Sequence, residues 1–329
     1  MSKTKATVLA SNCFSVKGYN KSLLIDFQNN EWYHVDFNLL SNESINEDDL
    51  KPEELEHLLK RQILIRIPEE LKNNFPALST EFDVPSIIES AIVDRNAKSQ
   101  YSLNSTFEWF DSLMVKLCEV RFYDLPAVSE LASILSLVED THIESINFIL
   151  PYSQELVEFF EKSLVLNPKI NDIVYHGSER VFVERDDPDK RRVFIREKLT
   201  SSDSCGNVHP TYFSNTKQHI LKSMNYNSCL YKKVGVDVDG NIKNCPSMKE
   251  SLGHVKSVES ILLKDLETKY WSIKKDDIEV CKDCEFRYIC NDCRVRVPNK
   301  NGRPETCIYN PYTNLWKGQE GYVDPKPIV

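Results

Sequence analysis

The spacing of the cysteines in the last third of this 329-residue chain is the feature that most restricts its fold. Eight of the ten cysteines follow residue 204, and only Cys13 and Cys118 precede it. Two CxxC pairs stand five residues apart, and each such pair can bring two sulfur atoms to one centre. Eight thiols are enough to hold two metal centres. They are Cys205, Cys229, Cys245, Cys281, Cys284, Cys290, Cys293 and Cys307.

The charge and the hydrophobic pattern argue against two classes of partner. The net charge is −9, which argues against nonspecific nucleic-acid binding, because that binding depends on Lys and Arg neutralising phosphates, although a local basic patch is compatible with this charge. No apolar run approaches the roughly 18 residues of a membrane-spanning helix, and the N-terminus has no convincing signal-peptide core. We therefore expect a cytoplasmic protein, in which thiols stay reduced and clustered cysteines indicate metal rather than disulfides.

Residues 1–84 are expected to form a small module with a hairpin and a winged-helix-like order of elements. Two apolar segments, 22–27 and 31–35, flank an Asn-containing turn of the kind that closes a hairpin. The leucines of 53–61 recur at helical spacing behind a proline that a first helical turn tolerates. Segment 63–67 then has the pattern of a strand.

Residues 85–200 alternate between strand and helix patterns, which indicates βαβ units and a parallel sheet. There are about three such units, too few for a complete eight-unit barrel, so a partial βα-barrel-like region is expected. The charged segment 184–192 has the pattern of a solvated loop. The predicted strands are 87–93, 115–122, 143–150 and 173–175, and the predicted helices are 106–113, 128–137 and 156–166, the first capped by Ser105.

Residues 201–329 form the cysteine-rich region and complete an α/β chain of three consecutive parts. Gly240 is expected to turn a hairpin between 234–238 and 242–244, which would bring Cys229 and Cys245 back together. From the residues alone three interpretations stay open: a compact zinc site at the two CxxC pairs, disulfides, or iron–sulfur clusters.

From Cys229 to Cys307 the spacing resembles the SPASM domain, the C-terminal twin-cluster module of radical-SAM peptide maturases. The signature of that family is C-x(9–15)-G-x4-C, followed by C-x2-C-x5-C-x3-C and a last cysteine. This chain has ten residues before Gly240, four after it, and the CxxC and x5 spacings. It departs from the signature at Cys293, which follows Cys290 by x2 rather than x3.

The resemblance implies two [4Fe-4S] clusters. The first would be held by Cys229, Cys245 and Cys293, with Cys205 as the proposed fourth ligand and His254 or a substrate atom as the alternatives. The second would be held by Cys281, Cys284, Cys290 and Cys307.

No CxxxCxxC motif can be built in residues 1–204, so no S-adenosylmethionine site is expected. A SPASM-like unit without a radical generator is similar to the SPASM-domain peptide maturases of grasp-with-spasm systems. That similarity implies two partners: an ATP-grasp ligase, which forms side-chain ester or amide links, and a short ribosomally synthesised precursor peptide.

The resemblance favours an accessory protein in peptide maturation and leaves open whether the chain itself is an enzyme. The N-terminal hairpin module would capture a leader peptide by strand addition. Its candidate lining residues, which are equally candidates for the core, are Ile25, Phe27, Trp32 and Tyr33. Two alternatives remain: a redox or Lewis-acid peptide-modifying enzyme that uses an incompletely ligated cluster, and a zinc-stabilised interaction protein.

Overall fold

The computed structural model describes residues 5–35, 45–75, 78–187 and 190–327. The chain folds into two compact units, each assembled from segments that are far apart in the sequence. Unit 1 contains residues 1–83, 206–229 and 272–329, and unit 2 contains residues 84–205 and 230–271. The predicted border at residue 84 falls where the chain first enters unit 2, whereas the predicted region 201–329 is shared between the units.

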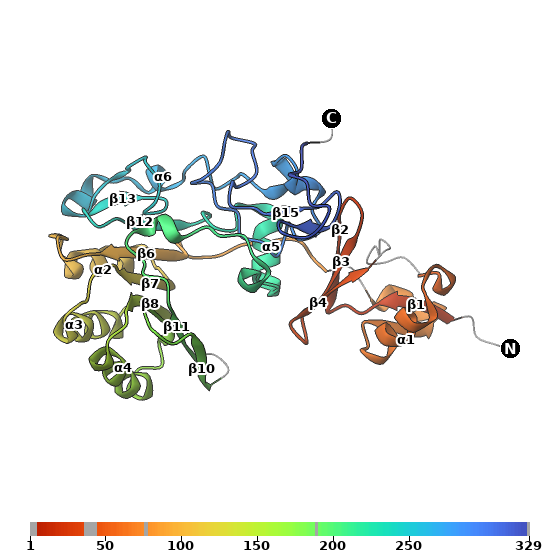
Figure 1. The fold of residues 1–329 in the computed structure, drawn as a ribbon, viewed down its shortest axis with the longest axis horizontal. Helices are drawn as coiled ribbons and strands as arrows, with labels where there is room; N and C mark the ends of the chain where they lie inside the picture. Colours follow the sequence, from red (N-terminus) through yellow and green to blue (C-terminus); the bar gives the residue numbers. More distant parts are fainter. Residues whose placement is uncertain (1–4, 36–44, 76–77, 188–189, 328–329) are drawn as a thin grey trace. The chain divides into compact units, whose positions relative to one another are not determined.

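Unit 2 is built on parallel strands that alternate with helices, as the sequence pattern predicted. The chain runs three times from a strand through a helix to the next parallel strand, which confirms three βαβ units. Figure 1 shows α3 and α4 side by side next to these strands. The elements are β6 (Ser90–Arg95), α2 (Leu103–Ser112), β7 (Leu117–Phe122), α3 (Val128–Glu139), β8 (Ser145–Pro151), α4 (Gln154–Leu166) and β9 (Ile170–His176).

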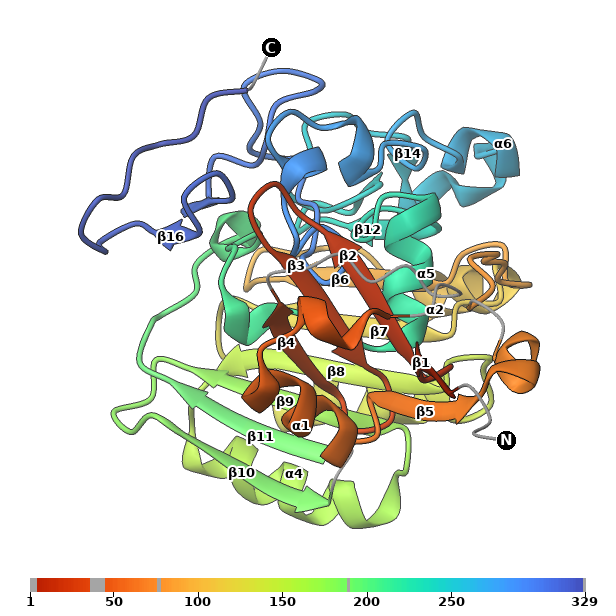
Figure 2. The ribbon, with the colours of Figure 1, turned by 90° about the vertical axis from the view of Figure 1, so that its right-hand side faces the viewer.

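Further strands extend this sheet to nine, in the order β10-β11-β9-β8-β7-β6-β12-β13-β14. The strands from β11 to β12 are parallel to their neighbours, and β10, β13 and β14 add antiparallel edges. Figure 2 shows the succession from β10 to β6 across the sheet. The added strands are β10 (Phe182–Asp187), β11 (Lys190–Ile195), β12 (Lys233–Val236), β13 (Asn241–Lys243) and β14 (Gly253–His254).

The prediction of a solvated loop at 184–192 was wrong, because most of this segment lies in the antiparallel hairpin of β10 and β11. Aromatic residues on both sides of the charged run hold the hairpin to the sheet. Phe182 stacks on Phe194 with ring centroids 4.1 Å apart, and Phe194 stacks on the buried Tyr175 of β9. The charged side chains of the hairpin can therefore face solvent without preventing strand formation.

The cores of the βαβ units are formed by apolar side chains from both strands and helices. Phe148 of β8 and Phe160 of α4 are fully buried, and their ring centroids lie 5.0 Å apart. The predicted cap of α2 was wrong by one turn. Ser102 rather than Ser105 is the N-cap residue, because its side chain accepts a hydrogen bond from the backbone N–H of Ser105.

The N-terminal part of unit 1 contains two small antiparallel sheets, in which β2, β3 and β4 form one and β1 pairs with β5. The predicted hairpin is confirmed: β3 and β4 are joined by a turn in which Asn30 has a φ of 56°. The predicted helix and the strand after it are present as α1 and β5. The elements are β1 (Lys5–Leu9), β2 (Cys13–Lys17), β3 (Ser22–Asp26), β4 (Glu31–Val35), α1 (Pro52–Lys60) and β5 (Leu64–Pro68).

The central strand β3 is buried on both faces. Leu24 packs in a core beneath α1, whereas Leu23 and Ile25 point to the opposite face and pack with Ile220 and Phe286 from distant parts of the chain. The N-terminal sheet and the cysteine-rich loops of unit 1 therefore share one hydrophobic core.

The remaining regular elements are short, and most of the cysteine-rich region consists of turns and loops. The predicted hairpin at Gly240 is confirmed by the pairing of β12 with β13. Gly240 has a φ of 88°, which a residue with a side chain adopts only at a cost. Within the described residues no helix is long and apolar enough to cross a membrane. The other elements are α5 (Lys217–Asn225), α6 (Leu263–Leu266), β15 (Tyr309–Asn310) and β16 (Leu315–Trp316).

Candidate metal centre

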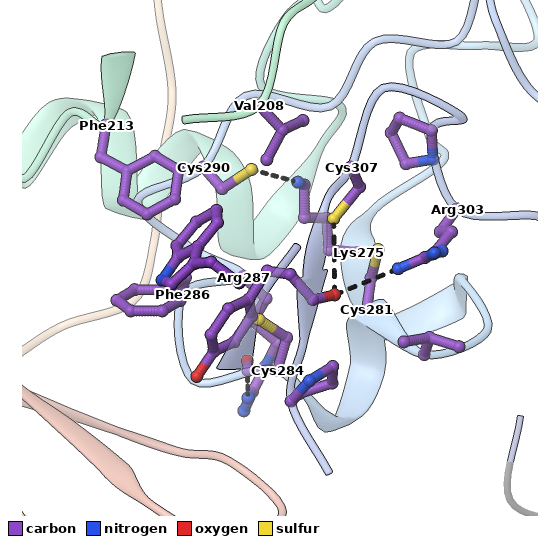
Figure 3. A pocket seen from close by; sticks show the side chains of 15 residues that line it. Val208, Phe213, Lys275, Cys281, Cys284, Phe286, Arg287, Cys290, Arg303 and Cys307 are labelled. Carbon is purple, nitrogen blue, oxygen red and sulfur yellow. Dashed lines mark hydrogen bonds between the residues drawn. The ribbon is translucent and has the colours of Figure 1, made fainter. Parts of the chain in front are cut away.

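Four of the predicted ligands line a single cavity in unit 1. They are Cys281, Cys284, Cys290 and Cys307, the four that the resemblance to the SPASM family places at the second cluster (Figure 3). Tight turns present them: the N–H of Cys284 donates to the carbonyl of Cys281 at 3.0 Å, and the N–H of Cys290 donates to that of Phe286 at 3.0 Å. Cys307 comes from a separate loop and approaches the cavity independently of the CxxC turn.

Aromatic side chains form a large part of the cavity wall. Phe286 is 2% exposed and lies between Phe213 and Tyr309, with ring centroids 5.2 and 5.0 Å away. Trp316 packs on Tyr309 at 4.6 Å. The sequence pattern does not reveal these walls, because the four rings are spread over about a hundred residues and only the fold brings them together.

A lysine lies within the same cavity, and the sequence pattern does not reveal it either. Lys275 is only 4% exposed, and its Nζ donates a hydrogen bond to Cys290 Sγ at 3.0 Å (Figure 3). It donates a second hydrogen bond to the carbonyl of Asn291 at 3.1 Å. Burial by itself lowers the pKa of Lys275. The negative charges of Cys290, Cys281 and Asp292 outweigh that effect and hold the pKa above its ordinary value.

Two arginines connect the cavity to the surrounding backbone. Arg287 donates to the carbonyl of Cys284 at 3.0 Å and to that of Lys17 in β2 at 2.6 Å, so it ties the cysteine turn to the N-terminal sheet. Arg303 donates to the carbonyl of Tyr309 at 3.1 Å. Both residues line the cavity and place positive charge beside the four thiols.

The donor set of the cavity fits an iron–sulfur cluster. Burial raises the pKa of the Cys281 thiol to about 12 and also raises that of Cys290, so both favour the neutral thiol, and the thiolates that ligate a metal would need a cationic partner. Among the described residues, no three His, Cys, Asp or Glu side chains come close enough to share one ion. Cys281, Cys284, Cys290 and Cys307 line the cavity and would hold the group there.

The other four predicted ligands are divided equally between the two units. In unit 1 a network of polar contacts brings the segments of Cys229 and Cys293 together: the backbone N–H of Asp292 donates to Ser228 Oγ at 3.1 Å, and Asn227 Nδ2 donates to Asp292 Oδ2 at 2.8 Å. Cys293 Sγ lies against Gly206, where a Cβ would approach it to 2.7 Å. Only glycine fits at that position.

Cys205 and Cys245 belong to unit 2. Cys205 is exposed and lies 4.0 Å from Nη2 of the buried Arg121, whereas Cys245 is buried beyond the end of β13. His254 uses both ring nitrogens in the local fold, since Nε2 contacts the carbonyl of Asp239 at 3.0 Å and Nδ1 accepts from the N–H of Lys256. These contacts favour a structural role for His254 over a ligand role.

The remaining two cysteines are core residues. Cys13 and Cys118 are 2% and 3% exposed, and burial raises the pKa of both thiols, that of Cys13 to about 12. All ten cysteines lie in the described part of the chain, and none of them forms a disulfide there.

A second group of buried polar residues lies at the carboxyl ends of β6 and β7, where parallel sheets commonly carry their sites. Asp94 is 2% exposed, accepts a hydrogen bond from the hydroxyl of Tyr123 at 2.9 Å, and has one carboxylate oxygen without a hydrogen-bond donor among the described residues. Burial raises the pKa of Asp94 from 3.8 to about 6, against the opposing effects of Arg121 and Tyr123.

Asp94 should make unit 2 less stable as the pH rises. Its charged form is disfavoured in the fold, so the cost is absent below about pH 4, grows between pH 4 and 6, and reaches roughly 3 kcal/mol above that range. Asp94→Asn should abolish this part of the pH dependence, as measured by hydrogen exchange of the β6 and β7 amides between pH 4.5 and 7.5. The exposed Asp140→Asn is the control. Identical pH profiles for wild type and Asp94→Asn would contradict the prediction.

Comparison of the chain with models of protein families, with curated proteins and with solved structures gave no match. What the chain does must therefore be inferred from the spacing of its cysteines and from the side chains around them.

Proposed function

We propose that this protein is an accessory of peptide maturation that holds two [4Fe-4S] clusters and acts with an ATP-grasp ligase on a ribosomally synthesised precursor peptide in the cytoplasm. The peptide and the ligase follow from the resemblance of the cysteine spacing to SPASM peptide maturases. The observation that supports the cofactor is the cavity, in which the four cysteines grouped by that resemblance lie together. A bound cluster would supply redox or Lewis-acid chemistry there, and the side chains of this chain position and shield it.

The proposal includes no radical-SAM chemistry. A radical generator needs three cysteines in a CxxxCxxC motif, and residues 1–204 contain only Cys13 and Cys118. Both are buried, Cys13 in the core of the N-terminal sheet and Cys118 in the core of the βαβ units. We infer that the parallel strands of unit 2 are a reduced relative of the radical-SAM barrel that keeps the sheet without the reaction centre.

The three-stranded sheet offers an edge for the peptide. β4 is an outer strand of the order β2-β3-β4, so within the described residues one of its edges is not paired with another strand. The prediction that Ile25 lines the peptide site was wrong, because Ile25 is fully buried in the central strand. Trp32 and Tyr33 of β4 are half-buried and stand at the edge that a peptide strand would extend.

Metal analysis of the anaerobically purified full chain tests the cofactor. We expect iron and acid-labile sulfide in equal amounts and a broad absorbance near roughly 400 nm from thiolate-bound iron. A colourless protein that contains zinc and unfolds on chelation would contradict the proposal and would favour a zinc-stabilised interaction protein.

Peptide capture is tested with the full chain, since the N-terminal sheet shares its core with Phe286 and Ile220. A synthetic precursor peptide is expected to bind with micromolar affinity in calorimetry and to slow hydrogen exchange of the β4 amides, because strand addition forms new backbone hydrogen bonds there. The amides of the inner strand β3 serve as the internal control. A scrambled peptide should give neither effect. Protection outside β4, or no binding in the micromolar range, would remove the leader-capture role.

A further inference from the structure

Lys275 is a buried cation in the wall of the cysteine-lined cavity. It begins the short 3₁₀ turn Lys275–Asp277 and directs its side chain inward, whereas its neighbours Lys274 and Asp276 are partly exposed. A buried ammonium loses its hydration and is costly unless hydrogen bonds and opposite charges replace it.

The partners of Lys275 are the groups that would ligate a cluster. Its two hydrogen bonds go to Cys290 Sγ and to the carbonyl of Asn291, and among the described residues it forms no salt bridge with a carboxylate. Asp292 is paired with Arg294 at 3.2 Å and accepts a hydrogen bond from Asn227. The ammonium therefore faces the thiols of the cavity, whose deprotonated forms would supply most of the negative charge near it.

We propose that Lys275 is the resident counter-charge of the cluster at Cys281, Cys284, Cys290 and Cys307, and that it raises the reduction potential of that cluster. The inference rests on the proposed function, because it requires the cluster to be present. Reduction adds a negative charge to the cluster, and a fixed cation in a water-poor site stabilises that charge. Hydrogen bonds to the ligating sulfurs and the net charge of the site are two of the factors that set cluster potentials.

Lys275 contacts a proposed ligand of this cluster directly, so its effect on the reduction potential should be confined to this cluster. Lys275 donates directly to the sulfur of Cys290, so its hydrogen bond withdraws electron density from a ligand atom. Lys282 stands between the ligands Cys281 and Cys284, but it is exposed, and water screens its charge. Lys275 and Lys282 therefore form a matched pair of lysines next to the same four thiols, one buried and one solvated.

The test is a dithionite redox titration of the anaerobically purified full chain, followed by electron paramagnetic resonance and by iron content. Lys275→Met keeps the length and apolar stem of the side chain, and it should shift the midpoint potential of one cluster to a more negative value. Lys275→Arg should restore most of the shift, and Lys282→Met should leave the potential near that of the wild type. The second cluster serves as the internal reference in each sample.

An unchanged midpoint in Lys275→Met with full iron content would overturn the proposal. If Lys275→Met binds too little iron to titrate, Lys275→Arg decides. If Lys275→Arg retains iron and Lys275→Met loses it, the proposed role of Lys275 as a counter-charge is supported. If both variants lose iron equally, that role is overturned. The iron content of the wild-type protein is measured first. A wild type without iron would refute the proposed function itself, which distinguishes that result from a failure of the role proposed for Lys275.

Discussion

If the proposed function holds, replacing Cys290 by alanine is expected to remove about half of the bound iron, because one of the two proposed clusters would lose a ligand. Cys290 is 7% exposed, lies in the cavity with three other cysteines and contacts Lys275. Its loss also leaves a buried ammonium without its sulfur partner, which adds a destabilising effect to the missing ligand. Iron and sulfide per chain, measured after anaerobic purification, check the result.

Cys118→Ala is the matched control for this experiment. Cys118 is equally buried, but it lies in the core of the parallel sheet and is not a predicted ligand. The control variant should keep its iron while it loses some stability through the small cavity that it creates. Full iron content in Cys290→Ala would contradict the assignment of the four thiols to one cluster.

Phe286→Ala should destabilise unit 1 by about 3–5 kcal/mol, the usual cost of removing a buried aromatic ring. The Phe286 ring lies 5.4 Å from that of Trp32 in β4 and 5.0 Å from that of Tyr309, so it joins the N-terminal sheet to the cysteine loops. It also lines the cavity, and we expect the variant to lose iron more readily to a chelator. Urea unfolding and the rate of iron release measure the two effects.

Tyr212→Ala is the control, because Tyr212 is an aromatic residue of the same unit that is 60% exposed. Its removal should change stability by no more than about 0.5 kcal/mol. A similarly small effect for Phe286→Ala, with unchanged iron release, would show that the ring does not hold the sheet and the loops together.

The regular elements of the fold were largely predictable because short-range patterns encode them. The turn at Asn30, the glycine turn at Gly240 and the apolar periodicity of the βαβ units are all properties of neighbouring residues. The hairpin at 184–192 was missed because the count of charges concealed the aromatic side chains beside it. Phe182 and Phe194 interact with each other across that hairpin, which no local window reveals.

The cavity could be predicted in part. The resemblance to the SPASM family implied the grouping of Cys281, Cys284, Cys290 and Cys307, and these four line the cavity. Lys275 could not be predicted, because the segment Lys274–Asp277 is so highly charged that it has the pattern of a solvated surface. Its burial follows from contacts with Cys290 and Asn291, fifteen and sixteen residues later in the chain.

Because unit 1 is assembled from segments far apart in the sequence, its hydrophobic core can be completed only late in synthesis. Leu23 and Ile25 leave the ribosome early, whereas Phe286, which covers them, is translated near the end. At synthesis rates of roughly 5–20 residues per second, that interval lasts on the order of 10–50 seconds. During this time one apolar face of the first sheet has no partner from its own chain. The cysteine-lined cavity, to which Phe286 and Cys307 contribute, can therefore form only after translation is nearly complete.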